Sequence, residues 1–263
     1  KFFPSDLTNK LNFLSRGQTW LPLFILVSAS LVGLADDILQ IYGKGKYTAG
    51  GISLFKRIVI VIVIGLLGAW WFYYKLGMST LIVPFVGEIN LGIIFIPIFI
   101  LTTLLMFSGG VIDGLDGLAG GIFAIIFSAY SGIAFFQNQI DLAAFCSVLV
   151  GGILAFLWFN IPPARFYMGE TGILGLTTAL TVVAFLTKST LALLVISFPL
   201  IATSASVVIQ LISKKFFHRK VFLVAPMHHH FEALGWPAYK VTMRYWVISI
   251  VLAVIGLVIA LVG

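Results

Sequence analysis

Long uninterrupted apolar runs recur along this chain, and they constrain its fold more than any other feature. Hydrophobic residues make up 60% of the 263 residues and charged residues only 10%, whereas a soluble domain carries about a quarter charged residues. One aqueous core cannot bury so much apolar surface, so the sequence predicts an integral membrane protein. Because the runs do not alternate with polar residues, the membrane spans are predicted to be helices and not barrel strands.

We therefore expect an all-α, polytopic transmembrane helical bundle with about eight spans in this chain. The whole of 1–263 is expected to form a single integral membrane domain. Because Lys1 is not an initiator methionine, we expect the chain to be incomplete at its N-terminus. Cys146 lies in an apolar run and cannot form an intrachain disulfide, since it is the only cysteine. The predicted spans are 20–35, 58–74, 91–107, 118–136, 142–159, 173–186, 191–212 and 247–262.

The net charge of +7 is explained by membrane topology and does not require nucleic acid as a partner. Of the 16 Lys and Arg residues, 11 fall in connections on one side of the predicted spans and 5 on the other. The richer side is predicted to be cytoplasmic. Its basic residues are Lys44, Lys46, Lys56, Arg57, Arg165, Lys214, Lys215, Arg219, Lys220, Lys240 and Arg244.

Acidic residues and histidines converge on this same predicted side. It holds six of the nine Asp and Glu residues, and Met227-His228-His229-His230-Phe231-Glu232 is predicted to form a loop there. Acidic residues contribute little to topology, so this bias indicates a functional site. The six acidic residues are Asp36, Asp37, Asp113, Asp116, Glu170 and Glu232.

Each of these elements also has a purely structural interpretation. Asp113 could cap a helix, and Glu170 at a helix start is favoured by the helix dipole. Asp36 and Asp37 close a predicted helix, where a negative charge is unfavourable, so a functional role is the stronger interpretation there.

Carboxylates with room for water and phosphate are typical of a Mg²⁺ site. Adjacent histidines cannot all face one way, which argues against a zinc tripod, but a histidine can carry a proton near neutral pH. Together these features suggest phosphoryl transfer to or from a lipid phosphate at a membrane surface.

The sequence resembles a known family at these positions. Pro226-Met227-His228-His229-His230-Phe231-Glu232 and the following Gly235-Trp236-Pro237 resemble the histidine motif of the phospho-N-acetylmuramoyl-pentapeptide-transferases (the MraY family). Asp36-Asp37, Asp113-Gly114-Leu115-Asp116-Gly117-Leu118 and Met168-Gly169-Glu170-Thr171-Gly172 resemble, in order, the other signatures of the polyprenyl-phosphate sugar-1-phosphate transferase superfamily. The resemblance covers essentially the whole chain. That family has ten transmembrane helices, and the eight expected here match its third to tenth.

The resemblance implies an activity and its partners. It implies Mg²⁺-dependent transfer of phospho-MurNAc-pentapeptide from UDP-MurNAc-pentapeptide to undecaprenyl phosphate, giving lipid I and UMP in peptidoglycan synthesis. The protein would lie in the bacterial inner (cytoplasmic) membrane with its active site facing the cytoplasm. Members of the family tend to dimerise, so a homodimer is an expectation.

The resemblance also implies roles for individual residues. Glu170 falls at the magnesium-binding position, and Asp36 and Asp37 match the pair that handles the lipid phosphate. His228 and His229 complete the expected catalytic residues. The expected substrate-binding residues are Asp113, Gly114, Leu115, Asp116, Asn160, Tyr167, Gln210 and His230.

The sequence departs from the family pattern at several positions. Glu170 replaces an Asp, Gln40 replaces a Lys that follows the Asp pair, and Phe107-Ser108-Gly109-Gly110 replaces an Asn-rich segment. Three alternatives follow: a related transferase that uses UDP-N-acetylglucosamine, a catalytically inactive scaffold, and a membrane transporter. A transporter would place ionisable residues in the middle of its spans, and these spans are nearly free of them.

Overall fold

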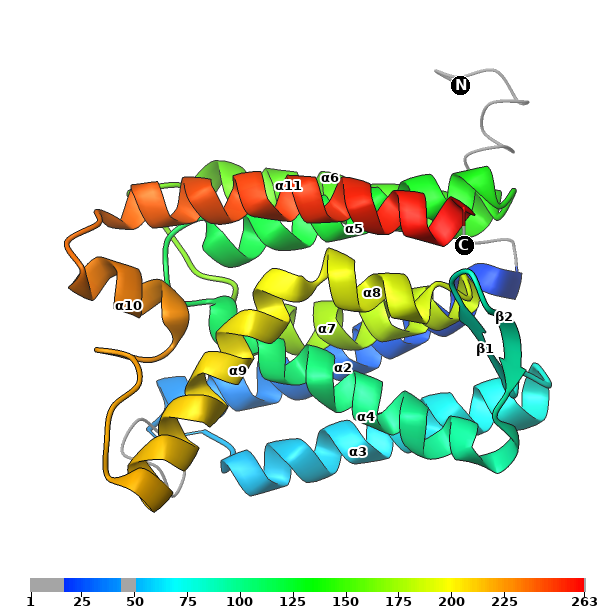
Figure 1. Cartoon of the computed structure of the whole chain (residues 1–263), viewed down its shortest axis with the longest axis horizontal. Helices are drawn as coiled ribbons and strands as arrows, with labels where there is room; N and C mark the ends of the chain where they lie inside the picture. Colours follow the sequence, from blue (N-terminus) through cyan, green and yellow to red (C-terminus); the bar gives the residue numbers. More distant parts are fainter. Residues whose placement is uncertain (1–16, 44–50, 263) are drawn as a thin grey trace.

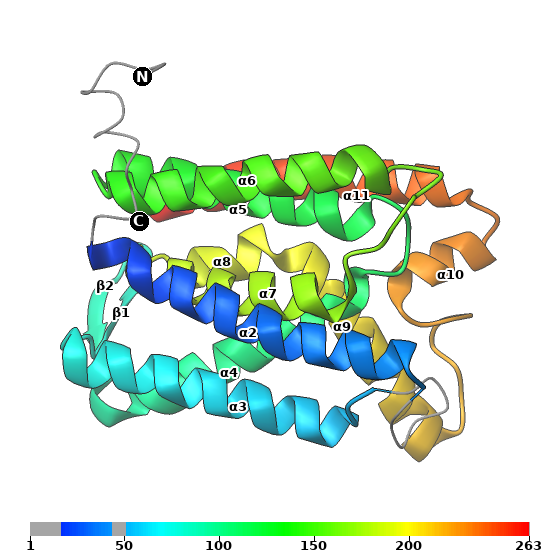
Figure 2. The same cartoon turned by 180° about the vertical axis from the view of Figure 1, so that it is seen from behind.

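Eight helices in the described part of the chain are long and apolar enough to cross a membrane, which confirms the predicted helical bundle. The computed structural model describes residues 17–43 and 51–262. Most of these helices run roughly along one common direction (Figures 1 and 2). The candidate spans are Thr19–Ile41, Leu54–Lys75, Gly92–Ile112, Leu118–Phe136, Ile140–Asn160, Gly169–Leu186, Phe198–Phe217 and Ala238–Val262.

The helices are numbered along the chain from α2. They are α2 (Gly17–Ile41), α3 (Leu54–Trp70), α4 (Phe95–Ser108), α5 (Leu118–Phe136), α6 (Ile140–Asn160), α7 (Gly169–Leu186), α8 (Thr190–Ile196), α9 (Phe198–Ile212), α10 (Met227–Ala233) and α11 (Ala238–Val262). Short 3₁₀ turns cover Gly92–Ile94 and Gly109–Ile112, and single π turns cover Trp71–Lys75 and Ser213–Phe217.

Helices α5 and α7 form the centre of the bundle. In each, 72% of the most apolar window is buried, against 22–33% in the other spans. Three threonines of α7 donate their hydroxyl groups to carbonyls one turn earlier: Thr177 to Ile173 at 2.7 Å, Thr178 to Leu174 at 2.7 Å and Thr181 to Thr177 at 3.3 Å. These three hydroxyl groups of α7 therefore find their hydrogen-bond acceptors within their own helix.

One feature of the fold lies outside the all-helical prediction. Strands β1 (Thr80–Val83) and β2 (Gly87–Asn90) form a two-stranded antiparallel hairpin between α3 and α4, with Thr80 opposite Asn90. Strands of four residues give no clear alternation in the sequence. The hairpin is tied to the end of α7 by an ion pair of 3.1 Å between Glu88 and Lys188. A hydrogen bond from Thr80, together with Lys188, lowers the pKa of Glu88.

The predicted span 191–212 was wrong at its start, because the chain breaks between α8 and α9, whereas its predicted end at Ile212 is the end of α9. The break lies at Ser197, whose hydroxyl donates to the Leu193 carbonyl at 2.5 Å. Pro199 follows at the start of α9, where its missing N–H costs nothing. The candidate membrane span begins only at Phe198 and continues to Phe217.

Two other predicted boundaries need correction. Helix α2 continues to Ile41, so Asp36 and Asp37 lie within it and not at its end. Helix α11 begins at Ala238, earlier than predicted, and includes Lys240 and Arg244, whose cations lie over the Trp236 ring at 5.4 and 4.0 Å. Long basic side chains can reach the membrane surface from inside a helix, which a hydropathy pattern does not register.

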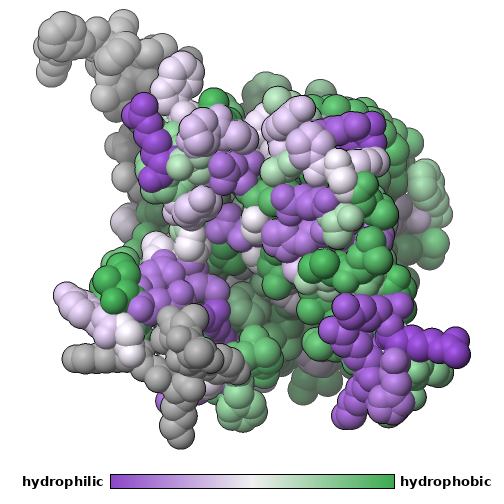
Figure 3. All heavy atoms as spheres, turned by 90° about the vertical axis from the view of Figure 1, so that its left-hand side faces the viewer, coloured by the Kyte–Doolittle hydropathy of each residue, from purple (hydrophilic) through white to green (hydrophobic). Residues whose placement is uncertain are grey.

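The histidine motif, predicted as a loop, is the short helix α10. In Figures 1 and 2 it lies at the same end of the bundle as the end of α2 and the starts of α3 and α7, whereas the hairpin lies at the opposite end. Figure 3 looks onto the α10 end, where hydrophilic side chains gather between apolar surfaces. The clustering of polar motifs at one end agrees with the sequence analysis.

Candidate active site

The site begins with a close contact between α2 and α7. A Cβ atom on Gly33 would lie 2.3 Å from the carbonyl oxygen of Glu170 and 2.7 Å from the Cα of Thr171. Only glycine allows the two helix backbones to approach this closely. Asp36 and Asp37 follow one turn later on α2, so the contact places both carboxylates beside the first turn of α7.

Asp37 caps the start of α7. Its carboxylate accepts the backbone N–H groups of Glu170 and Thr171 at 3.0 and 2.9 Å, and the Thr171 hydroxyl at 2.6 Å. The first N–H groups of a helix have no partner inside the helix, and a carboxylate there is also favoured by the dipole. Gly169, with φ of +63°, lies so close that an added Cβ would be 2.8 Å from Asp37 Oδ2. The Gly-Glu-Thr turn thus forms a cradle for Asp37.

Asp36 is buried and binds a different set of groups from Asp37. Its carboxylate accepts a short hydrogen bond from the Ile52 backbone N–H and a bond of 3.0 Å from the Gln40 amide. Arg57 Nη2 lies 2.7 Å from Asp36 Oδ2. Gln40, a departure from the family pattern, therefore acts as a neutral donor to Asp36.

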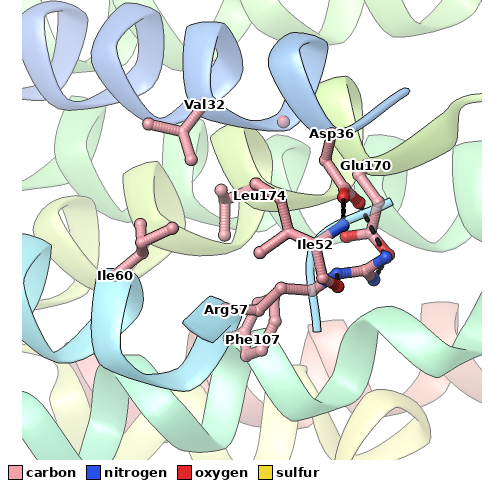
Figure 4. A pocket seen from close by; sticks show the side chains of 9 residues that line it. Val32, Asp36, Ile52, Arg57, Ile60, Phe107, Glu170 and Leu174 are labelled. Carbon is pink, nitrogen blue, oxygen red and sulfur yellow. Dashed lines mark hydrogen bonds and ion pairs between the residues drawn. The ribbon is translucent and has the colours of Figure 1, made fainter. Parts of the chain in front are cut away.

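Arg57, on the first turn of α3, joins the two carboxylates of Asp36 and Glu170. Its Nη1 donates to Glu170 Oε1 while its Nη2 contacts Asp36, as Figure 4 shows. In the sequence, Arg57 indicated only the membrane topology, and this role could not be seen. The signal in the sequence was that Arg57 directly precedes an apolar run. Basic residues at the ends of many membrane spans have the same position, so this signal does not identify a site.

Asp113 completes the acidic group from a third part of the chain. It follows the 3₁₀ turn after α4 and accepts a hydrogen bond from the backbone of Gly169. Burial raises the pKa of Asp113, the Gly169 bond opposes that rise, and the negative charge of Asp37 adds to it. The structure therefore brings together four of the predicted carboxylates, those of Asp36, Asp37, Asp113 and Glu170.

Two of the three histidines face this group. A Cβ on Gly114 would lie 2.4 Å from His228 Nε2 and 3.2 Å from His229 Nε2, so the absence of a side chain at Gly114 makes room for both rings. His229 Nδ1 pairs with Glu232 at 2.6 Å. His230 points elsewhere, and its Nδ1 accepts the Leu223 N–H at 3.1 Å. The prediction that the three rings cannot share one direction is consistent with this arrangement.

His228 is fully buried, and neither ring nitrogen has a hydrogen-bond partner among the residues that the structure describes. Burial, with a smaller effect from the adjacent His229, lowers the pKa of His228 to about 4. A neutral imidazole has one donor and one acceptor nitrogen, and in His228 both are unused beside the Asp113-Gly114 turn.

We expect the depressed pKa of His228 to appear in the pH dependence of stability. A histidine in the unfolded chain titrates near pH 6.5, whereas buried His228 stays neutral down to about pH 4. Between these two values only the unfolded state gains the proton, so the free energy of unfolding is largest above pH 6.5 and decreases as the pH falls toward 4. The stability of the parent protein should decline over this range more steeply than that of His228→Gln, by up to about 1.4 kcal/mol per pH unit. Thermal unfolding in detergent from pH 7 to 4 measures this difference. The control is His218→Gln, which replaces an exposed histidine. Parallel profiles for parent and His228→Gln would contradict it.

Asp116 and Asn160 hold a neighbouring loop in place. Asp116 accepts the Ala164 N–H at 3.0 Å, while Asn160 accepts the Gly117 N–H at 3.0 Å and donates to the Phe166 carbonyl at 2.9 Å. These bonds fix the connection between α6 and α7 against the start of α5. Their predicted contact with substrate stays a prediction.

The remaining predicted residues lie around this centre. Gln210 is buried, and both its amide oxygen and its amide nitrogen bind the loop after α9: the oxygen accepts the N–H groups of Val221 and Phe222, and the nitrogen donates to the Phe222 carbonyl. Leu115 packs against the main apolar core, and Tyr167 is exposed. The structure thus gives Gln210 a structural task that the sequence did not suggest.

The residue types fit a hard divalent cation. Among the described residues, no three His, Cys, Asp or Glu side chains are arranged to hold a metal ion as they stand. Carboxylates are the ligands that Mg²⁺ prefers, but Asp37 is bound to the start of α7 and Glu170 to Arg57. The space beside Asp36, Arg57 and Glu170 is about 10 Å³, which is the size of one water. Side chains must therefore move before a phosphate enters there.

Comparisons with known proteins point in one direction. The model of glycosyl transferase family 4 matches residues 19–188. A phospho-N-acetylmuramoyl-pentapeptide-transferase of Latilactobacillus sakei subsp. sakei (strain 23K) is 35% identical over 97% of this chain and 76% of its own length. Proteins with the same description from Dichelobacter nodosus (strain VCS1703A) and Chloroflexus aurantiacus (strain ATCC 29366 / DSM 635 / J-10-fl) are 37% and 36% identical, over 91% and 97% of this chain and 71% and 73% of their own lengths.

Proposed function

Because this chain belongs to the phospho-N-acetylmuramoyl-pentapeptide-transferase family and is a multi-pass membrane transferase, we propose that it transfers phospho-MurNAc-pentapeptide from UDP-MurNAc-pentapeptide to undecaprenyl phosphate. The products would be lipid I and UMP, and Mg²⁺ would be required. The observation that carries the proposal is the meeting of four carboxylates from three parts of the chain beside His228 and His229, at one end of the bundle.

The proposed reaction exchanges one phosphoanhydride for another. An oxygen of the lipid phosphate attacks the β-phosphorus of the UDP-sugar, the bond between that phosphorus and the bridging oxygen breaks, and UMP leaves with the electron pair. Glu170 and Asp113 would hold Mg²⁺, which when bound neutralises the charge of the pyrophosphate. No proton is consumed overall, so the residues mainly bind and orient charged groups.

The neighbouring residues have supporting roles in this proposal. Asp36 and Asp37 would orient the lipid phosphate, and the three hydrogen bonds from α7 to Asp37 hold that carboxylate in one position. His228 and His229 would contact the donor from the α10 side. Asp116 and Asn160 fix the loop that borders the site.

A transfer assay with defined substrates tests the proposal. The purified protein in nanodiscs receives undecaprenyl phosphate and either UDP-MurNAc-pentapeptide or UDP-N-acetylglucosamine, with and without Mg²⁺, and mass spectrometry identifies the lipid product. We expect lipid I only with the first donor and only with Mg²⁺. A product from UDP-N-acetylglucosamine would assign the related transferase activity. If neither donor gives a product, the catalytically inactive scaffold and the membrane transporter are the remaining alternatives.

We also propose that the active-site end faces the cytoplasm of a bacterial inner membrane. The native Cys146 is buried, so an introduced cysteine would dominate labelling by a membrane-impermeant thiol reagent. Lys220→Cys should react only from the cytoplasmic side, and Lys188→Cys, at the opposite end beside the hairpin, only from outside. Labelling of Lys220→Cys from outside intact cells would show that the topology is the opposite of the one proposed. The other cytoplasmic position of interest, Lys46, lies outside the described residues.

A further inference from the structure

Each of the three nitrogens of the Arg57 side chain has a partner. Its Nε donates to the Ile52 carbonyl at 3.0 Å, its Nη2 contacts Asp36 at 2.7 Å, and its Nη1 donates to Glu170. The backbone N–H of Ile52 in turn donates a hydrogen bond to Asp36. A guanidinium group presents its donors in a rigid planar fork, which suits two carboxylates on different helices. Figure 4 shows this fork between α2, α3 and α7.

The charges explain why a cation is needed at this position. The Asp36 side chain is only 4% exposed and that of Glu170 is 27% exposed. Two partly desolvated carboxylates repel each other, and an uncompensated buried charge is costly. Arg57 supplies one positive charge that both share.

A metal ion would need part of the same space. A carboxylate oxygen that accepts a guanidinium N–H must give up that bond to become a close Mg²⁺ ligand, since Mg²⁺ requires near-octahedral geometry at about 2.0–2.1 Å. A divalent ion next to Arg57 is also repelled by its charge. Metal and Arg57 therefore compete for Glu170, whereas Asp36 can keep its contact with Arg57.

We propose that Arg57 is a tethered competing cation: it occupies Glu170 in the metal-free protein and leaves Glu170, while remaining on Asp36, when a divalent ion binds. This inference rests on the proposed magnesium dependence. It makes Arg57 a positioning residue that sets the metal affinity of the site and keeps the carboxylates ordered when no metal is bound.

Mn²⁺ binding, measured by electron paramagnetic resonance on the full chain in detergent, tests the proposal without an activity readout. We expect Arg57→Gln to bind Mn²⁺ at least about tenfold more tightly than the parent, because a nearby positive charge is removed. Arg57→Lys should fall between them, since it keeps the charge but not the fork. The matched control is Lys56→Gln, which removes an exposed charge from the adjacent position of α3 and should change the affinity less than twofold.

Further outcomes separate this inference from the proposed function. Millimolar guanidinium ion should weaken Mn²⁺ binding to Arg57→Gln, restoring the competition, and have little effect on the parent. If the parent binds Mn²⁺ and transfers with Mg²⁺ but Arg57→Gln has equal or weaker affinity, the competition is refuted and the function stands. If Arg57→Gln does not fold, Arg57→Lys decides, and an affinity equal to that of the parent refutes the proposal. If no variant binds Mn²⁺, the metal dependence fails and this inference with it.

A second, independent observation concerns residues 214–220, which we name the basic lobe. All seven are exposed, and they include Lys214, Lys215, Arg219 and Lys220. None of these four makes an ion pair with a residue that the structure describes. The lobe begins in the last turn of the candidate membrane span, which ends at Phe217, and continues three residues beyond it. In Figure 3 a strongly hydrophilic group projects from the lower right of this end of the molecule.

The basic lobe combines charge with exposed aromatic surface in a fixed shape. Phe216 and Phe217 are 66% and 69% exposed. The Ser213 hydroxyl donates to the Arg219 carbonyl at 2.9 Å, and buried Gln210 holds the next residues, so the lobe has a defined backbone. Aromatic rings enter the interface of a bilayer, and lysines and arginines near them attract anionic lipid headgroups.

We infer that the basic lobe binds the headgroups of anionic phospholipids. Native mass spectrometry of the detergent-solubilised protein with equal phosphatidylglycerol and phosphatidylcholine tests this. The ratio of retained phosphatidylglycerol to phosphatidylcholine should fall at least about tenfold when the four basic residues are changed to Gln. The matched control is Lys240→Gln with Arg244→Gln, whose cations lie over Trp236, and it should leave the ratio unchanged.

Either of two results would overturn the lipid site. One is an unchanged ratio in the fourfold variant. The other is displacement of phosphatidylglycerol by undecaprenyl phosphate but not by added phosphatidylserine, which would make the lobe a substrate site. The double variant Arg219→Gln with Lys220→Gln serves if the fourfold variant does not fold, and an unchanged ratio in it would likewise refute the site.

Discussion

Glu170→Gln is expected to reduce magnesium-dependent transfer by at least about 100-fold, the loss typical of removing one electrostatic stabiliser from an active site. The change removes a negative charge from the place proposed for a divalent ion, and it also removes one of the two carboxylates that Arg57 contacts. Glu170→Asp keeps the charge and should retain measurable activity, because a Mg²⁺ site that holds several waters tolerates a shorter ligand. A Mg²⁺ titration of transfer by the three proteins measures both effects.

A carboxylate at the other end of the molecule provides the control for Glu170. Glu88 pairs with Lys188 beside the hairpin, so Glu88→Gln removes the same charge far from the proposed chemistry. It should leave the Mg²⁺ titration unchanged. If Glu170→Gln titrates like the parent, another carboxylate holds the metal, and Glu170 is only a residue favoured at the start of a helix by its dipole.

Gly33→Ala is expected to abolish transfer and to destabilise the protein. The new methyl group would lie 2.3 Å from the Glu170 carbonyl oxygen and 2.5 Å from its carbonyl carbon. These are backbone atoms that cannot rotate away, so α2 must shift from α7. Such overpacking costs about 1–3 kcal/mol, and the shift would also move Asp36 and Asp37 away from the first turn of α7. Thermal unfolding in a fixed detergent, together with the transfer assay, measures both consequences.

Gly151→Ala is the matched control for Gly33→Ala. Gly151 lies in α6, is exposed, and has nothing within 4 Å of an added Cβ. Alanine there should be neutral or stabilising by about 0.5–1 kcal/mol, because it restricts the unfolded chain. Equal behaviour of the two variants would mean that the contact between α2 and α7 can relax, and that it does not determine the position of the site.

The bundle and the end at which its polar groups gather could be predicted from the sequence, since both follow from large transfer free energies. Apolar runs of span length determine the helices, and polar residues left outside them must lie at the surfaces. The breaks and extensions could not be predicted in the same way. The break at Ser197 and the entry of Lys240 and Arg244 into α11 depend on single hydrogen bonds and ring contacts worth far less.

The candidate site was predictable as a set of residues but not as a set of contacts. Asp36 and Asp37 are adjacent in sequence, yet one faces Arg57 and the other the start of α7. Their separation depends on the rotation of α2, which the Gly33 contact determines and hydropathy does not. Arg57 and Gln210 act through partners distant in sequence, so a local pattern cannot show which groups they meet.

The threonines of α7 have a consequence for how the protein enters the bilayer. The main neighbours of α7 are α2 and α4, which precede it in the chain, but a membrane helix enters the lipid as a single span before it packs against its neighbours. The mean span hydropathy of α7 is a modest 1.5, and a hydroxyl that depended on another helix would stand unsatisfied in lipid during that interval. Because Thr177, Thr178 and Thr181 donate within their own helix, α7 can leave the insertion machinery as a self-sufficient span and acquire its neighbours afterwards.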